Sequence, residues 1–124
     1  MKLHAQTPEG TNLFTAYGEG WFAVNGRRYA GSVLVVPESA VVPWGVETFD
    51  ALTEADFERL LELEPELVLL GTGARQRFPH PRLTAPLARR QIGVEVMDTG
   101  AACRTYNILA GEGRRALAAL LPTG

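Results

Sequence analysis

The chain has 124 residues, of which 46% are hydrophobic and 21% charged, and its formal net charge is −2. This composition excludes an intrinsically disordered chain, because it supplies enough apolar surface to offset the entropy lost on ordering. The length is that of one domain, residues 1–124. The slight acidic excess argues against a nucleic-acid partner, since nucleic-acid-binding domains carry a basic excess.

The chemistry-bearing residues are few. Cys103 is the only cysteine and accompanies two histidines, His4 and His80, so neither an internal disulfide nor a zinc site is expected, and no cofactor is predicted. Residues 1–20 lack the apolar segment of a signal peptide, and the apolar runs are too short to span a membrane. The sequence therefore predicts a cytoplasmic protein without a membrane span.

The first third of the chain is typical of strands and turns. Leu13–Tyr17 forms a short apolar run, and Asn25-Gly26 is suited to a tight type I′ turn. Residues 21–24 and 27–29, on either side of that turn, are predicted to form an antiparallel hairpin. The continuous apolar run 33–36 predicts a strand buried on both faces.

Helices and strands alternate after residue 50. Thr53 can cap a helix whose apolar face contains Phe57, Leu60 and Leu61, and Pro65 ends it. Residues 67–70 predict a buried strand that leads into a glycine loop.

The next predicted helix covers residues 84–91, with Pro86 in its first turn and Gly93 as its C-cap. A strand is expected at 94–97. Asp98 or Thr99 can cap a further helix from 101 to about 110. Residues 115–121 fit either a helix or a strand. This alternation predicts an α/β fold with parallel strands in a mixed sheet, helices packed on it and an N-terminal antiparallel part.

Polar residues follow two of the predicted parallel strands, where ligands of open α/β sheets gather. A glycine loop at that place can cradle an anion through its N–H groups, although a simple tight turn with a positive φ is the commoner explanation. Asp98 can accept a hydrogen bond from a ligand or act only as a helix cap. The candidate crevice comprises Gly71, Thr72, Gly73, Arg75, Asp98, Thr99 and Arg104.

Other side chains allow competing interpretations. Cys103, near a helix start, is a candidate reactive thiol if His4 or His80 lies close to it, but a buried cysteine is the commoner case. Glu95 alternates with Val94 and Val96 and is expected to form a structural ion pair.

Trp44 and Phe78 lie in proline-flanked loops, where each either covers the edge of the core or forms an exposed docking patch. No Ser-His-Asp, paired-acid or metal-binding spacing is present, so the residues alone assign no catalytic group.

Several motifs resemble a small uncharacterised α/β family that includes the mitochondrial complex I assembly factor 3 and the adipogenesis-associated domain protein. The resemblance covers nearly the whole chain. The motifs are Gly71-Thr72-Gly73 with Phe78-Pro79, the run 93–99 (Gly-Val-Glu-Val-Met-Asp-Thr), the run 102–109 (Ala-Cys-Arg-Thr-Tyr-Asn-Ile-Leu) and Glu112-Gly113-Arg114.

This resemblance implies a compact three-layer fold around a central mixed sheet and makes residues 115–121 a strand. It implies no enzyme activity, and it implies a role played through a protein partner. We therefore expect a non-catalytic interaction or assembly-type protein, as a monomer or weak homodimer. The alternative is a small-molecule or anion-binding protein that uses the crevice.

Overall fold

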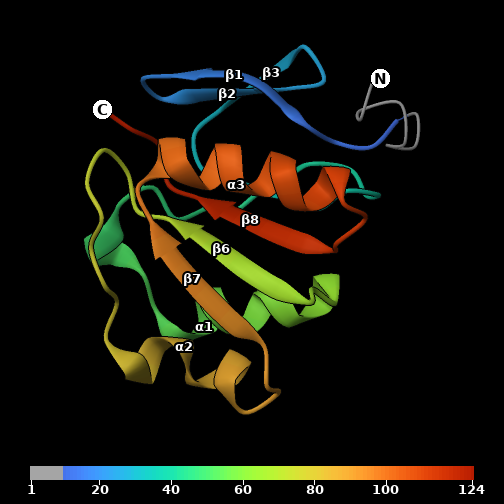
Figure 1. Ribbon diagram of the computed structural model, residues 1–124. Helices are drawn as coiled ribbons and strands as arrows, with labels where there is room; N and C mark the ends of the chain where they lie inside the picture. Colours follow the sequence, from blue (N-terminus) through green and yellow to red (C-terminus); the bar gives the residue numbers. More distant parts are fainter. Residues whose placement is uncertain (1–9) are drawn as a thin grey trace.

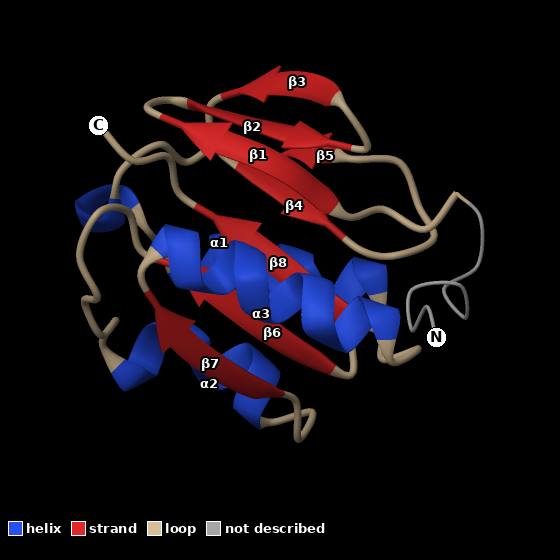
Figure 2. Cartoon of the chain, turned by 45° about the horizontal axis from the view of Figure 1, so that its top comes forward, coloured by secondary structure: helices blue, strands red, loops and turns tan. Residues whose placement is uncertain are grey.

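The computed structural model describes residues 10–124, and residues 1–9, including His4, lie outside that part. A five-stranded mixed sheet of order β5-β4-β8-β6-β7 lies at the centre. The helical segments α1, η3 and α2 cover one face, while α3 and a separate three-stranded antiparallel sheet, β1-β2-β3, cover the other (Figures 1 and 2). The expected α/β fold with a central mixed sheet is confirmed.

The elements follow one another in the order that the sequence indicated, with antiparallel strands first. Their bounds are β1 Phe14–Gly18, β2 Trp21–Val24, β3 Arg27–Ala30, β4 Val33–Val35, β5 Val42–Pro43, the 3₁₀ turn η2 Phe49–Ala51, α1 Glu54–Glu58, the 3₁₀ helix η3 Arg59–Leu63, β6 Leu67–Gly71, α2 Pro81–Ala88, β7 Gly93–Met97, α3 Thr99–Gly111 and β8 Ala116–Leu120.

Two crossovers connect the parallel strands. β7 and β8 pair with opposite edges of β6, so the chain reverses direction across the sheet after β7. Because parallel crossovers are right-handed, this reversal requires α2 and α3 to lie on opposite faces. The carboxyl ends of β6, β7 and β8 therefore meet at one edge of the sheet.

The central strand β8 is buried along its whole length. Ala116, Ala118 and Leu120 face α3, whereas Leu117 and Ala119 face α1 and α2. The small alanine side chains allow both layers to pack closely on the sheet. The strand implied for residues 115–121 by the family resemblance is thus confirmed as Ala116–Leu120.

Local signals placed several boundaries correctly. Asn25 and Gly26 have φ angles of 51° and 83°, as the hairpin turn requires. Thr53 and Asp56 form a reciprocal capping box at the start of α1. Asp98 caps α3 by accepting a hydrogen bond of 2.8 Å from the Ala101 N–H, although that helix begins at Thr99 rather than at residue 101.

The bounds predicted for the helix 84–91 were wrong, because the helix observed there, α2, lies three residues earlier. α2 begins at Pro81, because the His80 ring nitrogen accepts a hydrogen bond from the Arg82 N–H and caps the helix. Because α2 begins at Pro81 and ends at Ala88, Pro86 lies inside the helix and not in its first turn. Gln91, with φ of 60°, supplies the left-handed residue expected of Gly93, which instead begins β7.

Glu95 does not form the predicted ion pair. It is exposed on β7, the outer strand of the five-stranded sheet, and no cation among residues 10–124 forms a salt bridge with it. A charged residue on an edge strand stays in water and needs no partner. The alternation with Val94 and Val96 predicts that Glu95 points to the opposite face from its neighbours, but it does not predict that β7 is an outer strand of the sheet.

α3 joins the two sheets through polar contacts. The Asn107 side chain accepts a hydrogen bond from the Phe14 N–H and donates one to the Phe14 carbonyl, each at 2.8 Å. One residue earlier, the buried Tyr106 ring packs edge-on against Phe14, and its hydroxyl donates to the Asn12 carbonyl at 2.9 Å. α3 therefore holds β1 as a neighbouring strand would.

We expect Asn107→Leu to lower the free energy of unfolding by about 3 kcal/mol, because the Phe14 N–H and C=O lose their partners in a partly buried place. Urea unfolding measures this loss. Ile108→Ala, on the same helix but 62% exposed, is the control and should change stability by less than about 0.5 kcal/mol. Equal effects of the two substitutions would contradict the assignment.

Candidate functional site

A single buried hydroxyl connects the ends of the parallel strands. Thr99 Oγ1 accepts a hydrogen bond of 2.8 Å from the Gly73 N–H and donates one of 2.7 Å to the Leu121 carbonyl. The Thr99 N–H donates in turn to the Gly73 carbonyl at 2.9 Å. The segments that follow β6, β7 and β8 are thereby held against one another.

Two glycines permit this approach. A Cβ on Gly71 would lie 2.7 Å from a Leu120 methyl carbon and 3.1 Å from the Thr99 Cα, so a side chain does not fit there. Gly73 has a φ of 98°, which L-residues rarely adopt. The Gly71-Thr72-Gly73 sequence is therefore explained by close packing and by a turn.

The polar groups of this loop are used within the protein. The Thr72 hydroxyl donates to the Arg75 carbonyl at 2.6 Å and accepts from the Arg77 N–H at 3.1 Å. The Thr72 N–H donates to the Met97 carbonyl at 3.0 Å. With the Gly73 N–H bound to Thr99, these donors are not available to an anion, and the structure gives no support to the anion cradle.

A shallow pocket of about 380 Å³ does open at this edge of the sheet. Thr72, Gly73 and Arg75 line it, but Gly71, Asp98, Thr99 and Arg104 do not. Asp98 is the α3 cap, and Arg104 donates to the Tyr17 hydroxyl at 3.1 Å on the side of β1. The structure therefore brings together only part of the predicted crevice.

Sequence reasoning missed the other side of this pocket. Arg77 forms an ion pair of 3.0 Å with Asp50, and its guanidinium lies 4.2 Å from the centre of the Phe49 ring. Glu47, which also lines the pocket, accepts hydrogen bonds from the Ser32 N–H and hydroxyl. Asp50 and Arg77 are 27 residues apart, and no local pattern indicated that they meet.

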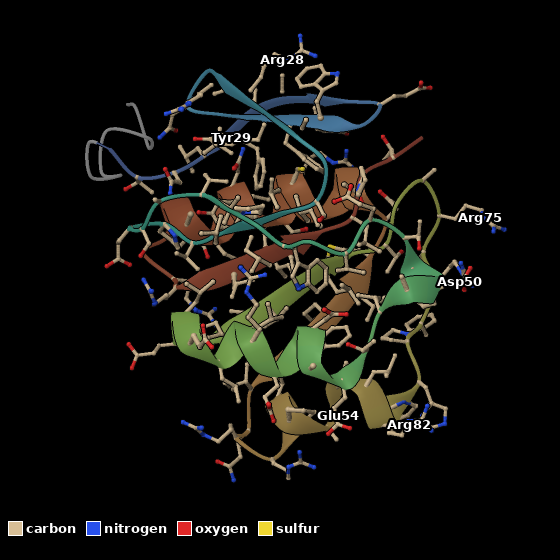
Figure 3. All side chains as sticks on the ribbon, turned by 180° about the vertical axis from the view of Figure 1, so that it is seen from behind. Arg28, Tyr29, Asp50, Glu54, Arg75 and Arg82 are labelled. Carbon is tan, nitrogen blue, oxygen red and sulfur yellow. The ribbon has the colours of Figure 1, made fainter. Side chains whose placement is uncertain are left out.

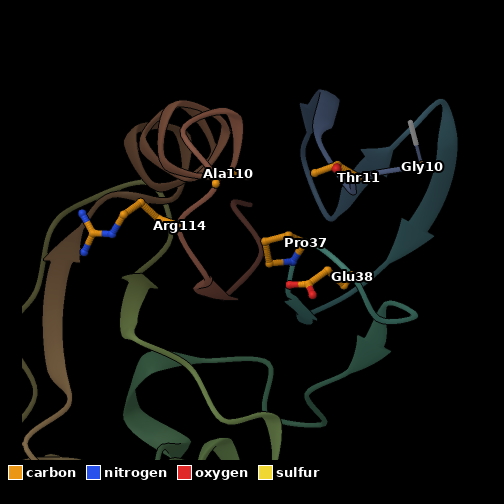
Figure 4. A pocket seen from close by; sticks show the side chains of 7 residues that line it. Gly10, Thr11, Pro37, Glu38, Ala110 and Arg114 are labelled. Atoms are coloured by element: carbon orange, nitrogen blue, oxygen red, sulfur yellow. The ribbon is translucent and has the colours of Figure 1, made fainter. Parts of the chain in front are cut away.

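A larger pocket of about 520 Å³ lies between the segment before β1, the segment after β4 and the end of α3 with the turn that follows it (Figure 4). Its charged side chains are engaged with neighbours. Glu38 binds Arg115 at 2.8 Å, and Arg114 lies 3.6 Å from Glu66. No His, Cys, Asp and Glu side chains within residues 10–124 group as metal ligands, and no helix of that part is long and apolar enough to span a membrane.

Cys103 is a core residue and not an accessible thiol. Its side chain is 2% exposed and packs among the apolar residues between α3 and the two sheets. Burial raises the pKa of the Cys103 thiol to about 12, and the neighbouring Arg104 charge lowers it only in part. The thiol is therefore protonated at neutral pH, contrary to the interpretation of Cys103 as a reactive group.

The two candidate docking aromatics have opposite environments. Trp44 is 2% exposed, packs edge-on against Phe57 and donates its ring N–H to the Asp56 carbonyl at 3.3 Å. It covers the core and is not a docking residue. Phe78 is 72% exposed and remains the candidate.

We expect Thr99→Val to lower the free energy of unfolding by about 3 kcal/mol, because the Leu121 carbonyl and the Gly73 N–H become buried without a partner. Thr99→Ser keeps the hydroxyl and should cost only about 1 kcal/mol, the value of one methyl group. Urea unfolding of both variants measures the difference. If serine were no better than valine, the hydroxyl would not hold these strand ends.

Cys103 in the folded protein should react with iodoacetamide at pH 8 at least about 100-fold more slowly than in urea, because its thiolate is scarce and covered. Mass spectrometry over time measures the alkylation. Rapid labelling of the folded chain would reinstate Cys103 as a reactive thiol.

Comparison with known proteins places this architecture among relatives. The bovine NADH dehydrogenase [ubiquinone] 1 alpha subcomplex assembly factor 3 is 41% identical over 109 residues, which are 86% of this chain and 59% of that protein. The mouse protein of the same name is 36% identical over 97% of this chain and 65% of its own length. The chain thus spans less than two thirds of these curated relatives.

Solved structures match over nearly the full length of both chains. A crystal structure of a Bordetella parapertussis protein has a TM-score of 0.86 and 43% identity, covering 93% of this chain and 99% of that one. A Bordetella pertussis protein described as an Mth938-like domain has a TM-score of 0.84 and 36% identity, covering 98% and 92%. A family model matches residues 14–121, and the chain therefore belongs to the family described as "Protein of unknown function (DUF498/DUF598)".

Proposed function

We propose that this protein acts by binding a protein partner during assembly of a larger complex, and not by catalysis. The observation that carries this proposal is its 41% identity to an NADH dehydrogenase assembly factor over 86% of the chain. The proposed partner is accordingly a subunit, or another assembly factor, of an NADH dehydrogenase. On this proposal the protein works in the cytoplasm, as a monomer or weak homodimer.

The geometry of the strand ends supports this choice. In open α/β sheets, this edge is where small ligands usually bind. Here the Thr72 and Gly73 N–H groups and the Thr99 hydroxyl hold loops together. The edge therefore serves as a rigid support for the loop that follows β6.

Phe78 is the residue that we propose as the anchor for the partner. Large aromatic and arginine side chains contribute most of the binding energy in protein interfaces. Phe78 is 72% exposed and follows Arg77, whose guanidinium contacts Asp50 and the Phe49 ring. An exposed aromatic side chain next to an arginine provides the elements of such an anchor.

Deletion of the gene in the native host should lower the amount of assembled NADH dehydrogenase, measured on native gels and as NADH oxidation by membranes. Wild-type protein should restore it, and Phe78→Ser should not, because loss of an anchor weakens a complex by roughly 30-fold. Ile108→Ser, at another exposed apolar position, is the matched control and should restore assembly.

Co-purification provides the direct measurement. Tagged wild-type protein should retain a stoichiometric partner that Phe78→Ser loses and Ile108→Ser keeps. A deletion strain with normal NADH dehydrogenase would contradict the assembly role. Repeated purification without any stoichiometric protein would contradict partner binding itself.

A further inference from the structure

Positive charge is concentrated in one continuous part of the chain. The chain carries 14 acidic residues, yet residues 67–94 contain none of them. The same stretch contains five of the arginines, namely Arg75, Arg77, Arg82, Arg89 and Arg90. A protein with a net charge of −2 therefore contains one strongly cationic segment.

Three of these arginines lie within four residues of Phe78 in the chain. We call residues 75–82 the arginine loop; it connects β6 to α2 and includes the first two residues of that helix. Arg75, Asp50 and Arg82 lie along one side of the molecule, with Asp50 between the two arginines (Figure 3). Phe78, 72% exposed, is midway between the two arginines in sequence.

Only some of these charges are neutralised within the protein. Arg77 pairs with Asp50, and Arg89 lies 3.5 Å from Glu54. Arg75 and Arg82 are exposed, and neither forms a salt bridge within residues 10–124. Along the sequence, Phe78 thus lies between two arginines that form no salt bridge with a carboxylate of this part of the chain.

Arg82 also occupies an unfavourable place. It lies in the first turn of α2, a turn that contains no acidic residue. The N-terminus of a helix carries partial positive charge, so a cation there is repelled and an anion is favoured. A residue that breaks a local rule without a visible gain in stability is typical of a functional position.

The arginine loop is held in one conformation. The Thr72 hydroxyl forms hydrogen bonds with two backbone groups of the loop, the Arg75 carbonyl and the Arg77 N–H. The Gln76 side chain donates to the Val96 carbonyl at 2.9 Å. Pro79 and Pro81 restrict the remaining backbone. Binding through a fixed loop loses little conformational entropy, so the loop is prepared to recognise a defined surface.

We propose that the arginine loop binds an acidic segment of a protein partner, in which carboxylates flank an apolar pocket or side chain that receives Phe78. This inference rests on the proposed function and specifies the chemistry of the partner. Guanidinium groups bind carboxylates in a bidentate manner, and the positive end of α2 favours the same anion.

The charges and the apolar surface favour a protein over other anionic partners. A lipid surface needs more apolar anchorage than Phe78, the exposed aromatic residue of the arginine loop, provides. An extended polyanion such as nucleic acid would also meet the acidic remainder of the chain, which repels it. A local acidic segment contacts only the arginine loop.

The test is selection of a phage-displayed library of random dodecapeptides on the full-length immobilised protein. Enriched peptides should carry Asp or Glu on both sides of an apolar residue. An enriched peptide, synthesised with a fluorescent label, should bind the Arg75→Glu, Arg82→Glu double variant at least about 10-fold more weakly, and its affinity for the wild type should fall with added NaCl. Phe78→Ser should also weaken binding.

Arg27→Glu is the matched control, because Arg27 is an exposed arginine on β3 at the opposite end of the molecule, and it should leave binding unchanged. Unfolding midpoints equal to the wild type verify that the double variant is folded. Failure to enrich acidic peptides, or equal binding by the double variant, would overturn the proposal. Arginine-dependent binding to phosphatidylglycerol–phosphatidylcholine vesicles without peptide binding would overturn it in favour of a lipid surface.

The two proposals fail in different ways. If the deletion strain loses assembled NADH dehydrogenase and the double variant restores it fully, the assembly role stands and the arginine loop is not its interface. If peptides bind as expected but deletion leaves NADH dehydrogenase intact, the acidic partner belongs to another process and the assembly role is wrong.

Discussion

The arrangement at the carboxyl ends of the parallel strands depends on the hydrogen bonds of the Thr99 hydroxyl. This hydroxyl bonds simultaneously to the segment after β6 and to the segment after β8, and it is itself at the start of α3. Such a group must be buried with both partners in place, because an unpaired polar group there is costly. This requirement excludes a side chain at Gly71 and fixes the direction in which the loop leaves β6.

The second constraint is the position of α3 between two sheets. A small sheet is stable only when its apolar face is covered, so β1-β2-β3 needs a partner surface. α3 supplies the apolar surface through Ala102, Cys103 and Tyr106, and the Asn107 amide supplies the polar contact to the edge strand β1. Cys103 is thus a packing residue, and its raised pKa is a consequence of that packing.

These two constraints explain why the proposed interface lies on a loop. Many α/β proteins bind ligands at the carboxyl ends of their parallel strands. Here the polar groups at these ends form hydrogen bonds within the protein. The same bonds hold the arginine loop and present Phe78 to solvent. A scaffold that displays an exposed aromatic residue in a segment rich in arginine is suited to recognising a protein surface.

The sequence by itself determined the local features. Asn25-Gly26 specified its turn, Thr53 and Asp98 specified helix starts, and residues 67–70 specified a buried strand, because each signal acts within a few residues. The family resemblance was needed for β8, since its alanines and leucines suit a helix equally well by local preference.

Only the tertiary structure decided which side chains meet. His80 caps the start of α2 and Arg89 its end, so the helix covers Pro81–Ala88 instead of the predicted 84–91. Trp44 is buried, Glu95 is exposed to water, and Arg104 contacts Tyr17 and does not line the crevice. Each outcome depends on the neighbours that the sheet order and the handed crossovers bring close, and pairs as distant as Asp50 and Arg77 leave no periodic signal in the sequence.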